Sequence, residues 1–270
     1  RKDSPMILGV ANGESYIGSD VPAILKYTRE VYYIGNQEMA RVRKGEITFY
    51  NLDGEEIEKE LKTIEWDAEA AEKAGYEHFM MKEIHEQPKA VADTLNSVVK
   101  DGVIDLSEVG LSEEEIKGIS QIYIVACGSA YHVGVAAQYV LEDLARIPVR
   151  VELASEFRYR NPILDPNGLV IIISQSGETA DSLAALRESK KQGVKTLGIV
   201  NVIGSSIARE ADNVFYTLAG PEIAVATTKA YSTQLIASYV LAIQFAKIRE
   251  QITEEQYTGY IEELKTLPDK

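Results

Sequence analysis

The sequence has little cysteine and no long apolar run. Cys127 is the one thiol among 270 residues, and we interpret it as a small buried residue rather than a nucleophile. A single cysteine cannot form a disulfide within the chain, so we expect a reducing, cytoplasmic compartment. The longest apolar runs, at 122–127 and 169–173, fall far short of the roughly 18 residues typical of a membrane-spanning helix. We therefore expect no membrane partner.

Basic residues are also fewer than acidic ones. The chain has 28 Lys and Arg residues against 42 Asp and Glu, a net charge of −14. This balance argues against a nucleic-acid partner, since such surfaces are basic. It leaves room for a small phosphate ligand, because backbone N–H groups and hydroxyls can hold an anion locally. Residues 53–86 alone carry 12 acidic and 4 basic residues, which predicts a solvated connector.

Signatures of several site classes are missing. No G-x-G-x-x-G follows a predicted strand and no G-x-x-x-x-G-K-[ST] is present, which disfavours dinucleotide and P-loop nucleotide binding. Ser176 lacks the glycine two residues earlier that a hydrolase elbow requires. His78, His85 and His132 have no Cys or His partner at metal-ligand spacing. We expect no metal and no nucleotide cofactor.

The first 65 residues predict a small antiparallel sheet. β-branched and aromatic residues gather at 31–34, 39–43 and 46–50, and a short helix is expected at 21–26. We interpret Gly35-Asn36, Lys44-Gly45 and Asp53-Gly54 as the hairpin turns between these strands. From Trp66 the pattern becomes acidic and helical, with Pro88 breaking or starting a helix, and a further helix is expected to begin at Ser112.

Beyond Gln121, uninterrupted apolar runs alternate with helical stretches. The predicted strands are 122–126, 149–153, 169–173, 195–200 and 214–218, and the predicted helices are 130–144, 156–159, 179–192, 205–210 and 228–249. Strands that are apolar on both faces and each followed by a helix are typical of a buried parallel sheet. The fold class is therefore α/β, with a doubly wound five-stranded parallel sheet. The last helix is apolar nearly all round, so we expect it to pack on two sides and to help cover a second copy.

The turn after the third of these strands is the strongest candidate site. Ser174, Ser176 and Thr179 place three hydroxyls, together with Gly177, at the start of a predicted helix. The positive end of a helix dipole favours an anion, and no Lys or Arg occurs between 169 and 186. The pattern predicts phosphate binding by dipoles and hydroxyls. The alternative is plain helix capping by Ser176 or Thr179.

Other turns at the same edge of the sheet add weaker signals. Ser129, after the first strand, offers one hydroxyl beside Gly128. We interpret Gly204-Ser205-Ser206, after the fourth strand, chiefly as a helix cap. The loop at 219–229 is long and apolar, with one acid and one base.

These segments resemble a known family. The run 174–181, Ser-Gln-Ser-Gly-Glu-Thr-Ala-Asp, is similar to the hallmark of sugar isomerase (SIS) domains. The fuller set is similar to the glutamine–fructose-6-phosphate aminotransferases, and it comprises residues 78–88, 127–129, 154–160, 174–181, 204–206 and 222–230. The resemblance implies an internal fragment. Its parts would be the end of a glutaminase domain (1–65), an acidic helical linker (66–115), the first SIS domain (116–252) and the start of a connector to a second one (253–270).

The resemblance also implies a function. Members of the family take ammonia from glutamine and convert fructose 6-phosphate to glucosamine 6-phosphate. Carried over by position, the phosphate would contact Ser174, Ser176 and Thr179, with Ser129 helping. The sugar would lie near Gln175, Val225, Glu222 and Thr227. The groups for glutamine hydrolysis and proton transfer would lie outside this chain, so we expect no complete catalytic set and a homodimer that binds fructose 6-phosphate or glucosamine 6-phosphate.

The sequence departs from the family's pattern at two positions, and two other functions are considered. Ser129 stands where the family usually has Thr, and Ala130 stands where some members have Ser. A non-catalytic sugar-phosphate sensor is an alternative, but no basic helix-turn-helix is visible in residues 1–120. A free-standing phosphosugar isomerase is another, but His132 is the only histidine after residue 85.

Overall fold

A computed structural model describes residues 6–64 and 73–270, which form two compact units. The first unit comprises the described residues up to Phe79 together with 220–223, and the second comprises 80–219 and 224–270. The predicted start of the helical segment at Trp66 lies outside the described residues. Within those residues, no helix has the length and apolar character needed to cross a membrane.

The first unit contains two antiparallel sheets. Its elements are β1 (Ile7–Ala11), β2 (Glu14–Gly18), α1 (Val21–Ile24), β3 (Glu30–Tyr33), β4 (Met39–Arg43), β5 (Glu46–Tyr50), β6 (Glu56–Ile57) and β7 (Lys62–Thr63). The sheet orders are β2-β1-β3-β7 and β4-β5-β6. Lys44-Gly45 and Asp53-Gly54 lie at hairpin turns, as predicted. The prediction for Gly35-Asn36 was wrong, because β3 pairs with β1 and β7 while β4 pairs with β5.

The helix α2 (Phe79–Val98) corrects a second prediction, because it runs unbroken through Pro88. Proline lacks the N–H that would bond to the carbonyl four residues earlier, which here belongs to Ile84. The side-chain amide of Gln87 donates to that carbonyl at 3.2 Å. This side chain therefore supplies the Ile84 carbonyl with a donor inside the unbroken helix.

The second unit is built on the predicted five-stranded parallel sheet. Its strands are β10 (Gln121–Ala126), β11 (Val149–Leu153), β12 (Gly168–Ser174), β13 (Lys195–Val200) and β14 (Asn213–Tyr216), in the order β11-β10-β12-β13-β14. Every residue of β12 is buried, which explains its uninterrupted apolar run. A two-stranded ribbon, β8 (Val99–Lys100) and β9 (Val103–Ile104), precedes the sheet.

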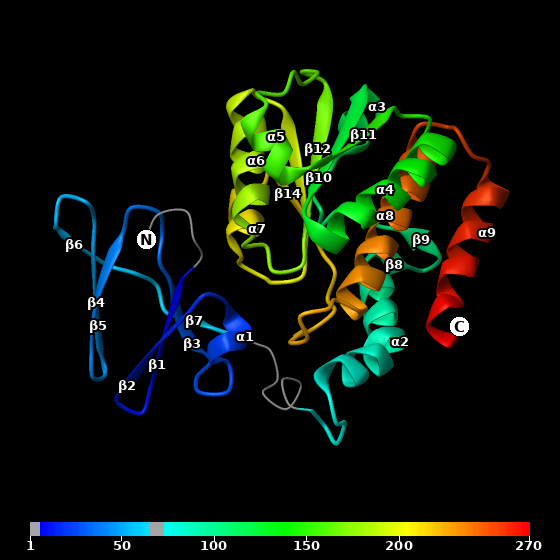
Figure 1. Ribbon diagram of the computed structural model, residues 1–270. Coiled ribbons are helices and arrows are strands. Elements are labelled where there is room, and N and C mark those ends of the chain that lie inside the picture. The colour runs from blue at the N-terminus through cyan, green and yellow to red at the C-terminus, as the bar shows by residue number, and fades with distance from the viewer. Residues whose placement is uncertain (1–5, 65–72) are drawn as a thin grey trace. The chain divides into compact units, whose positions relative to one another are not determined.

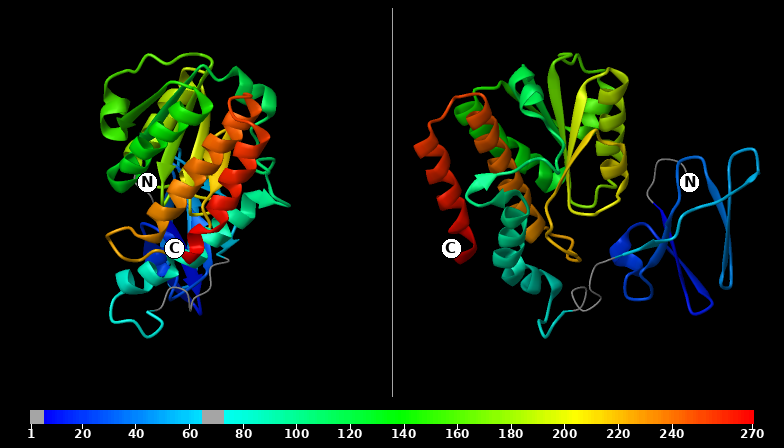
Figure 2. Two further views of the ribbon diagram at one scale, coloured as in Figure 1. Left: turned by 90° about the vertical axis from the view of Figure 1, so that its right-hand side faces the viewer. Right: turned by 180° about the vertical axis from the view of Figure 1, so that it is seen from behind.

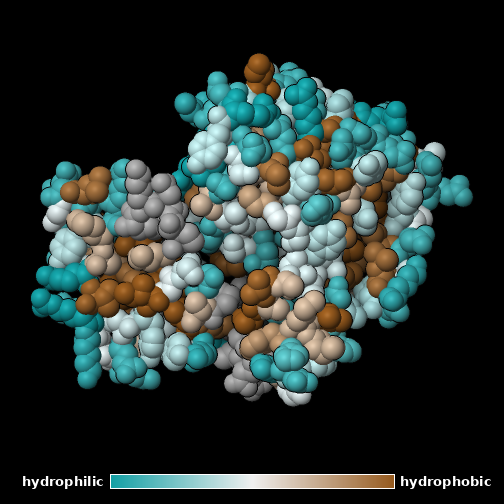
Figure 3. Space-filling model, in the orientation of Figure 1, coloured by the Kyte–Doolittle hydropathy of each residue, from teal (hydrophilic) through white to brown (hydrophobic). Residues whose placement is uncertain are grey.

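Helices cover both faces of this sheet (Figures 1 and 2). They are α3 (Glu113–Gly118), α4 (Gly128–Val140) with a π-helical turn at Leu141–Ala145, α5 (Ala154–Tyr159), α6 (Ala180–Lys191), α7 (Ser206–Glu210), α8 (Lys229–Ile248) and α9 (Glu254–Lys265). Residues of α4, α8 and α9 share one apolar cluster with one face of the strands, and α5, α6 and α7 share another with the opposite face. Hydrophilic residues cover most of the surface over α5 and α6 (Figure 3).

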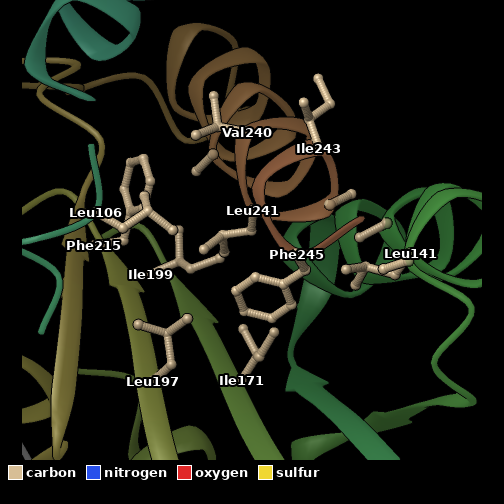
Figure 4. Packing of buried hydrophobic residues seen from close by; sticks show 14 of the residues in the cluster. Leu106, Leu141, Ile171, Leu197, Ile199, Phe215, Val240, Leu241, Ile243 and Phe245 are labelled. Carbon is tan, nitrogen blue, oxygen red and sulfur yellow. The ribbon is translucent and has the colours of Figure 1, made fainter. Parts of the chain in front are cut away.

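The long helix α8 is buried by its own chain. Leu241 and Phe245 extend from α8 toward Ile171 and Ile199 of the sheet (Figure 4). The other sides of α8 pack against α3, α4 and α9. The helix α8 therefore packs on more than one side, as predicted, and its neighbours are elements of the same chain. This burial removes the argument that the apolar character of α8 reflects a second copy.

An ion pair between α3 and β13 gives a pH-dependent stability. The hydrogen bond from Lys195, followed by those from Ser112, lowers the pKa of Glu115 from 4.5 to about 2. Because the folded pKa lies below the unfolded one, this stabilisation is complete above about pH 4.5 and is lost as the pH falls toward 2.

We expect Glu115→Gln to lower the free energy of unfolding at pH 7 by about 1 kcal/mol, a value reduced by solvent screening of a partly exposed pair. Denaturant unfolding at pH 7 and pH 3 measures the difference between variant and parent. A difference that does not shrink at pH 3 would contradict this account.

Candidate functional site

The candidate site lies where the sheet changes its winding direction. From β10 the chain passes through α4 to β11 at one edge, and from β12 it passes through α6 to β13 in the other direction. In open parallel sheets, ligands bind at the carboxyl ends of the strands at this switch point. The strand β10 pairs with β12 in a register that sets Ala126 opposite Ile173. The turns that follow these strands therefore start side by side.

The turn after β12 is closed by its own hydroxyls. Ser174 is buried at the end of the strand, and its Oγ lies 3.0 Å from Thr179 Oγ1. The backbone N–H of Gly177 donates to Ser174 Oγ at 3.1 Å, and that of Glu178 donates to Ser176 Oγ at 3.2 Å. A hydroxyl that accepts from a backbone N–H keeps its own proton for another acceptor. Ser176 and Thr179 are half-buried, so their hydroxyls can reach a ligand.

These hydroxyls do not cap the helix that follows. Thr179 is the N-cap residue of α6, yet within the described residues its side chain makes no capping hydrogen bond. The Ser176 hydroxyl serves the turn itself, through the N–H of Glu178. The helix-capping alternative is therefore not what the structure shows. The first turn of this 12-residue helix keeps N–H groups that can receive an anion.

A clamp to the next loop holds the turn in place. The Glu178 carboxylate accepts from the backbone N–H of Ser206 at 2.7 Å and from its hydroxyl at 2.8 Å. The carbonyl of Gly177 accepts from the N–H of Ile207 at 3.0 Å. The sequence suggested that Ser205 and Ser206 cap α7, but Ser205 makes no side-chain capping bond in the described structure. The cap comes from Glu178, which sequence reasoning did not assign.

Asp181 brings a negative charge to the start of α6, and Arg158 neutralises it. Arg158 on α5 donates to Asp181 Oδ1 at 2.7 Å. Without this partner the carboxylate would repel an anion at the helix N-terminus. Sequence reasoning missed this pair, since its residues lie on separate helices. Among the described residues, no group of three or more His, Cys, Asp or Glu side chains is placed to hold a metal ion.

Ser129 follows β10, the strand that neighbours β12 in the sheet. It is an exposed residue in the first turn of α4, which starts directly after β10. Gly128 adopts a φ of +58°, which lets the chain turn sharply into the helix. Cys127, at the N-cap, is half-buried, and its sulfur lies 4.0 Å from Ser182 Oγ. Ser129 and the 174–179 turn thus start from neighbouring strands.

The residues predicted to contact the sugar lie in two segments of the chain, one in the turn and one in the loop before α8. Gln175 is half-buried, and its carbonyl accepts from Asn201 N at 3.1 Å. Val225 is fully exposed and Thr227 is half-buried. Both lie in a loop that α2 contacts at its two ends, through Glu83 and Glu86. Glu222 is half-buried and lies in the segment 220–223, which groups with the first unit.

Comparison with known proteins identifies the family. Residues 115–244 match the model of the SIS domain. The chain is 54% identical over 271 residues to the "Glutamine--fructose-6-phosphate aminotransferase [isomerizing]" proteins of Caldanaerobacter subterraneus subsp. tengcongensis and Clostridium acetobutylicum. Each alignment covers 100% of this chain and 45% of the relative.

A solved structure agrees with the sequence match. The C-terminal domain of glucosamine-fructose-6-phosphate aminotransferase from Francisella tularensis superimposes with a TM-score of 0.71 at 46% identity. The match covers 73% of this chain and 56% of that one. The chain thus spans less than half the length of the two sequence relatives, and over that span it belongs to the glutamine–fructose-6-phosphate aminotransferase family.

Proposed function

We propose that this chain binds the sugar phosphate in an enzyme that makes glucosamine 6-phosphate from fructose 6-phosphate and glutamine. The observation that carries the proposal is the turn 174–179, whose hydroxyls are gathered at a switch point without capping the helix that follows. The relatives' names, which give glutamine, fructose 6-phosphate, amino transfer and isomerisation, support the substrate. We propose that the isomerisation is of the ketose–aldose kind.

The chemistry of the turn suits a phosphate held mainly by neutral donors. The Ser176 and Thr179 hydroxyls and the first N–H groups of α6 would donate to the phosphate oxygens, and Ser129 would add a hydroxyl from α4. The dipole of α6 supplies the positive potential, since 169–186 contains no Lys or Arg. Gln175, Val225, Glu222 and Thr227 would lie nearer the sugar.

We assign binding rather than proton transfer to these residues. Apart from Glu222, none of the proposed contacts is a carboxylate, histidine, lysine or cysteine that could exchange a proton near neutral pH. The full reaction would then need groups beyond this set.

We further propose that the protein is a cytoplasmic homodimer. Its domains would be those that the resemblance implies. Sedimentation across micromolar concentrations tests the dimer, and a monomer throughout would contradict it.

Ser176→Ala tests the assigned contact. A hydrogen bond to a charged group contributes about 1.5–3 kcal/mol, so we expect affinity for fructose 6-phosphate to fall roughly ten- to a hundredfold. Calorimetric titration measures this dissociation constant. Ser189→Ala is the matched control, because Ser189 lies near the other end of α6 and donates to Ala185 O at 2.8 Å. Equal affinities in the two variants would contradict the assignment.

A further inference from the structure

Buried charges connect α2 with the start of α8. Lys229, the first residue of α8, is 3% exposed, and its Nζ lies 2.7 Å from Glu86 Oε2. Glu86 also pairs with Lys82 at 3.4 Å, one turn earlier on α2. Glu83, on the same part of the helix, is 1% exposed. Two carboxylates and two ammonium groups thus lie on or against one helix.

Lys229 occupies an unfavourable place for a cation. It stands at the N-terminus of a 20-residue helix, where the dipole favours negative charge. Burial adds a desolvation cost that a well-packed apolar side chain would avoid. Buried ion pairs are therefore weak evidence of stability, and their best-attested use is to specify one arrangement. The arrangement specified here is the path of the chain that enters α8.

The segment that leads into α8 is the loop 224–228, which contains Val225 and Thr227, two of the proposed sugar contacts. At its start, the backbone N–H of Ala224 donates to Glu83 Oε1 at 3.0 Å. At its end, Lys229 is held by Glu86, and Ser232, within the first turn of α8, donates to Gln87 Oε1 at 2.6 Å. Both ends of the loop 224–228 are therefore fixed by α2.

The middle of the loop has little packing of its own. The Val225 side chain is fully exposed and Ala226 is exposed, so apolar burial cannot set their positions. The contacts with Glu83 and Glu86 hold the two ends of the loop to α2. We propose that Glu83, Glu86 and Lys229 are positioning residues, which hold the loop 224–228 in the shape that contacts the sugar. The ligand in this inference rests on the proposed function, whereas the anchoring does not.

The test replaces Lys229 by methionine. This change keeps the length of the side chain and leaves Glu86 paired with Lys82, so no buried carboxylate loses every partner. Glu86→Gln is the second variant, in case the first does not fold. Lys89→Met is the matched control, because Lys89 lies on α2 and pairs with Asp93 on the solvent side at 2.5 Å.

Two measurements on the full chain separate the possible outcomes. Without ligand, amide hydrogen exchange at 224–228 should become about tenfold faster in Lys229→Met and stay unchanged in Lys89→Met. By calorimetry, fructose 6-phosphate should bind about tenfold more weakly, while inorganic phosphate binds as before, because the phosphate turn belongs to other elements.

Other results would contradict either the positioning role or the proposed function, and the two cases can be told apart. Unchanged exchange at 224–228, or an equal loss of affinity for both ligands, would overturn the positioning role. If the parent chain binds neither ligand while exchange in the variant still increases, the proposed function fails. The anchoring of the loop by α2 would be supported in that case.

Discussion

Gly177→Ala is expected to abolish measurable sugar-phosphate binding and to destabilise the second unit. Gly177 has a φ of +65°, and a Cβ built on it would overlap Ser205 Oγ and lie 2.5 Å from Ser205 Cβ. The left-handed conformation costs about 1 kcal/mol and the overlap about 2 kcal/mol more. The free energy of unfolding should fall by about 3 kcal/mol, which lowers the melting temperature by roughly 10 °C.

The binding loss follows from the same overlap. The turn must move away from Ser205, which displaces the Ser176 hydroxyl and the N-terminus of α6 together. Losing two hydrogen bonds to a charged ligand, at about 1.5 kcal/mol each, reduces affinity more than a hundredfold. Gly193→Ala is the matched control, since Gly193 has a φ of +76° with nothing within 4 Å of the added Cβ. Calorimetry and thermal unfolding that give the same values for both variants would contradict the close contact with Ser205.

Phe245→Ala is expected to have the largest effect on stability. The Phe245 side chain is 0% exposed and belongs to the cluster between α8 and the sheet. Truncating a buried phenylalanine costs about 4 kcal/mol, because burial is lost and a cavity remains. Denaturant unfolding measures this loss.

Phe245→Leu supplies the comparison for that variant. It keeps most of the apolar volume, so its cost should be about 1 kcal/mol. A similar small cost for both substitutions would mean that α8 does not pack on the sheet as described. The same result would weaken the case that α8 is buried by its own chain.

The sheet of the second unit could be predicted because its signal is local. Each of the five strands is an apolar run followed by a helical pattern, and such runs in parallel order leave few alternatives. The candidate turn was found for the same reason, since Ser174, Ser176 and Thr179 lie within six residues of sequence. General rules about the carboxyl edge of parallel sheets then supplied its place.

The errors about individual elements have separate causes. Gly35-Asn36 has the composition of a hairpin turn, but local composition does not reveal that β3 pairs with β1. Asn12-Gly13, with both residues at positive φ, joins β1 to β2 and is a strong hairpin signal that the sequence prediction did not use. Pro88 was misjudged because the compensating bond comes from a side chain.

The residues that support the site could not be predicted from the sequence, because their partners are distant along the chain. Glu178 appeared as one more polar residue of the turn, and its partner Ser206 lies 28 positions later. Glu83 and Ala224 are 141 positions apart. No periodicity or turn signature links such pairs. Only the folded chain shows that Glu178 and Glu83 hold neighbouring loops.

The most direct test of the central claim is calorimetric titration of this chain with fructose 6-phosphate, with fructose and inorganic phosphate as comparisons. We predict saturable binding of fructose 6-phosphate, weaker binding of inorganic phosphate and none of fructose, since the turn 174–179 recognises the phosphate. Fructose binding as tightly as fructose 6-phosphate, or no binding of the phosphate ester by a folded chain, would contradict the account.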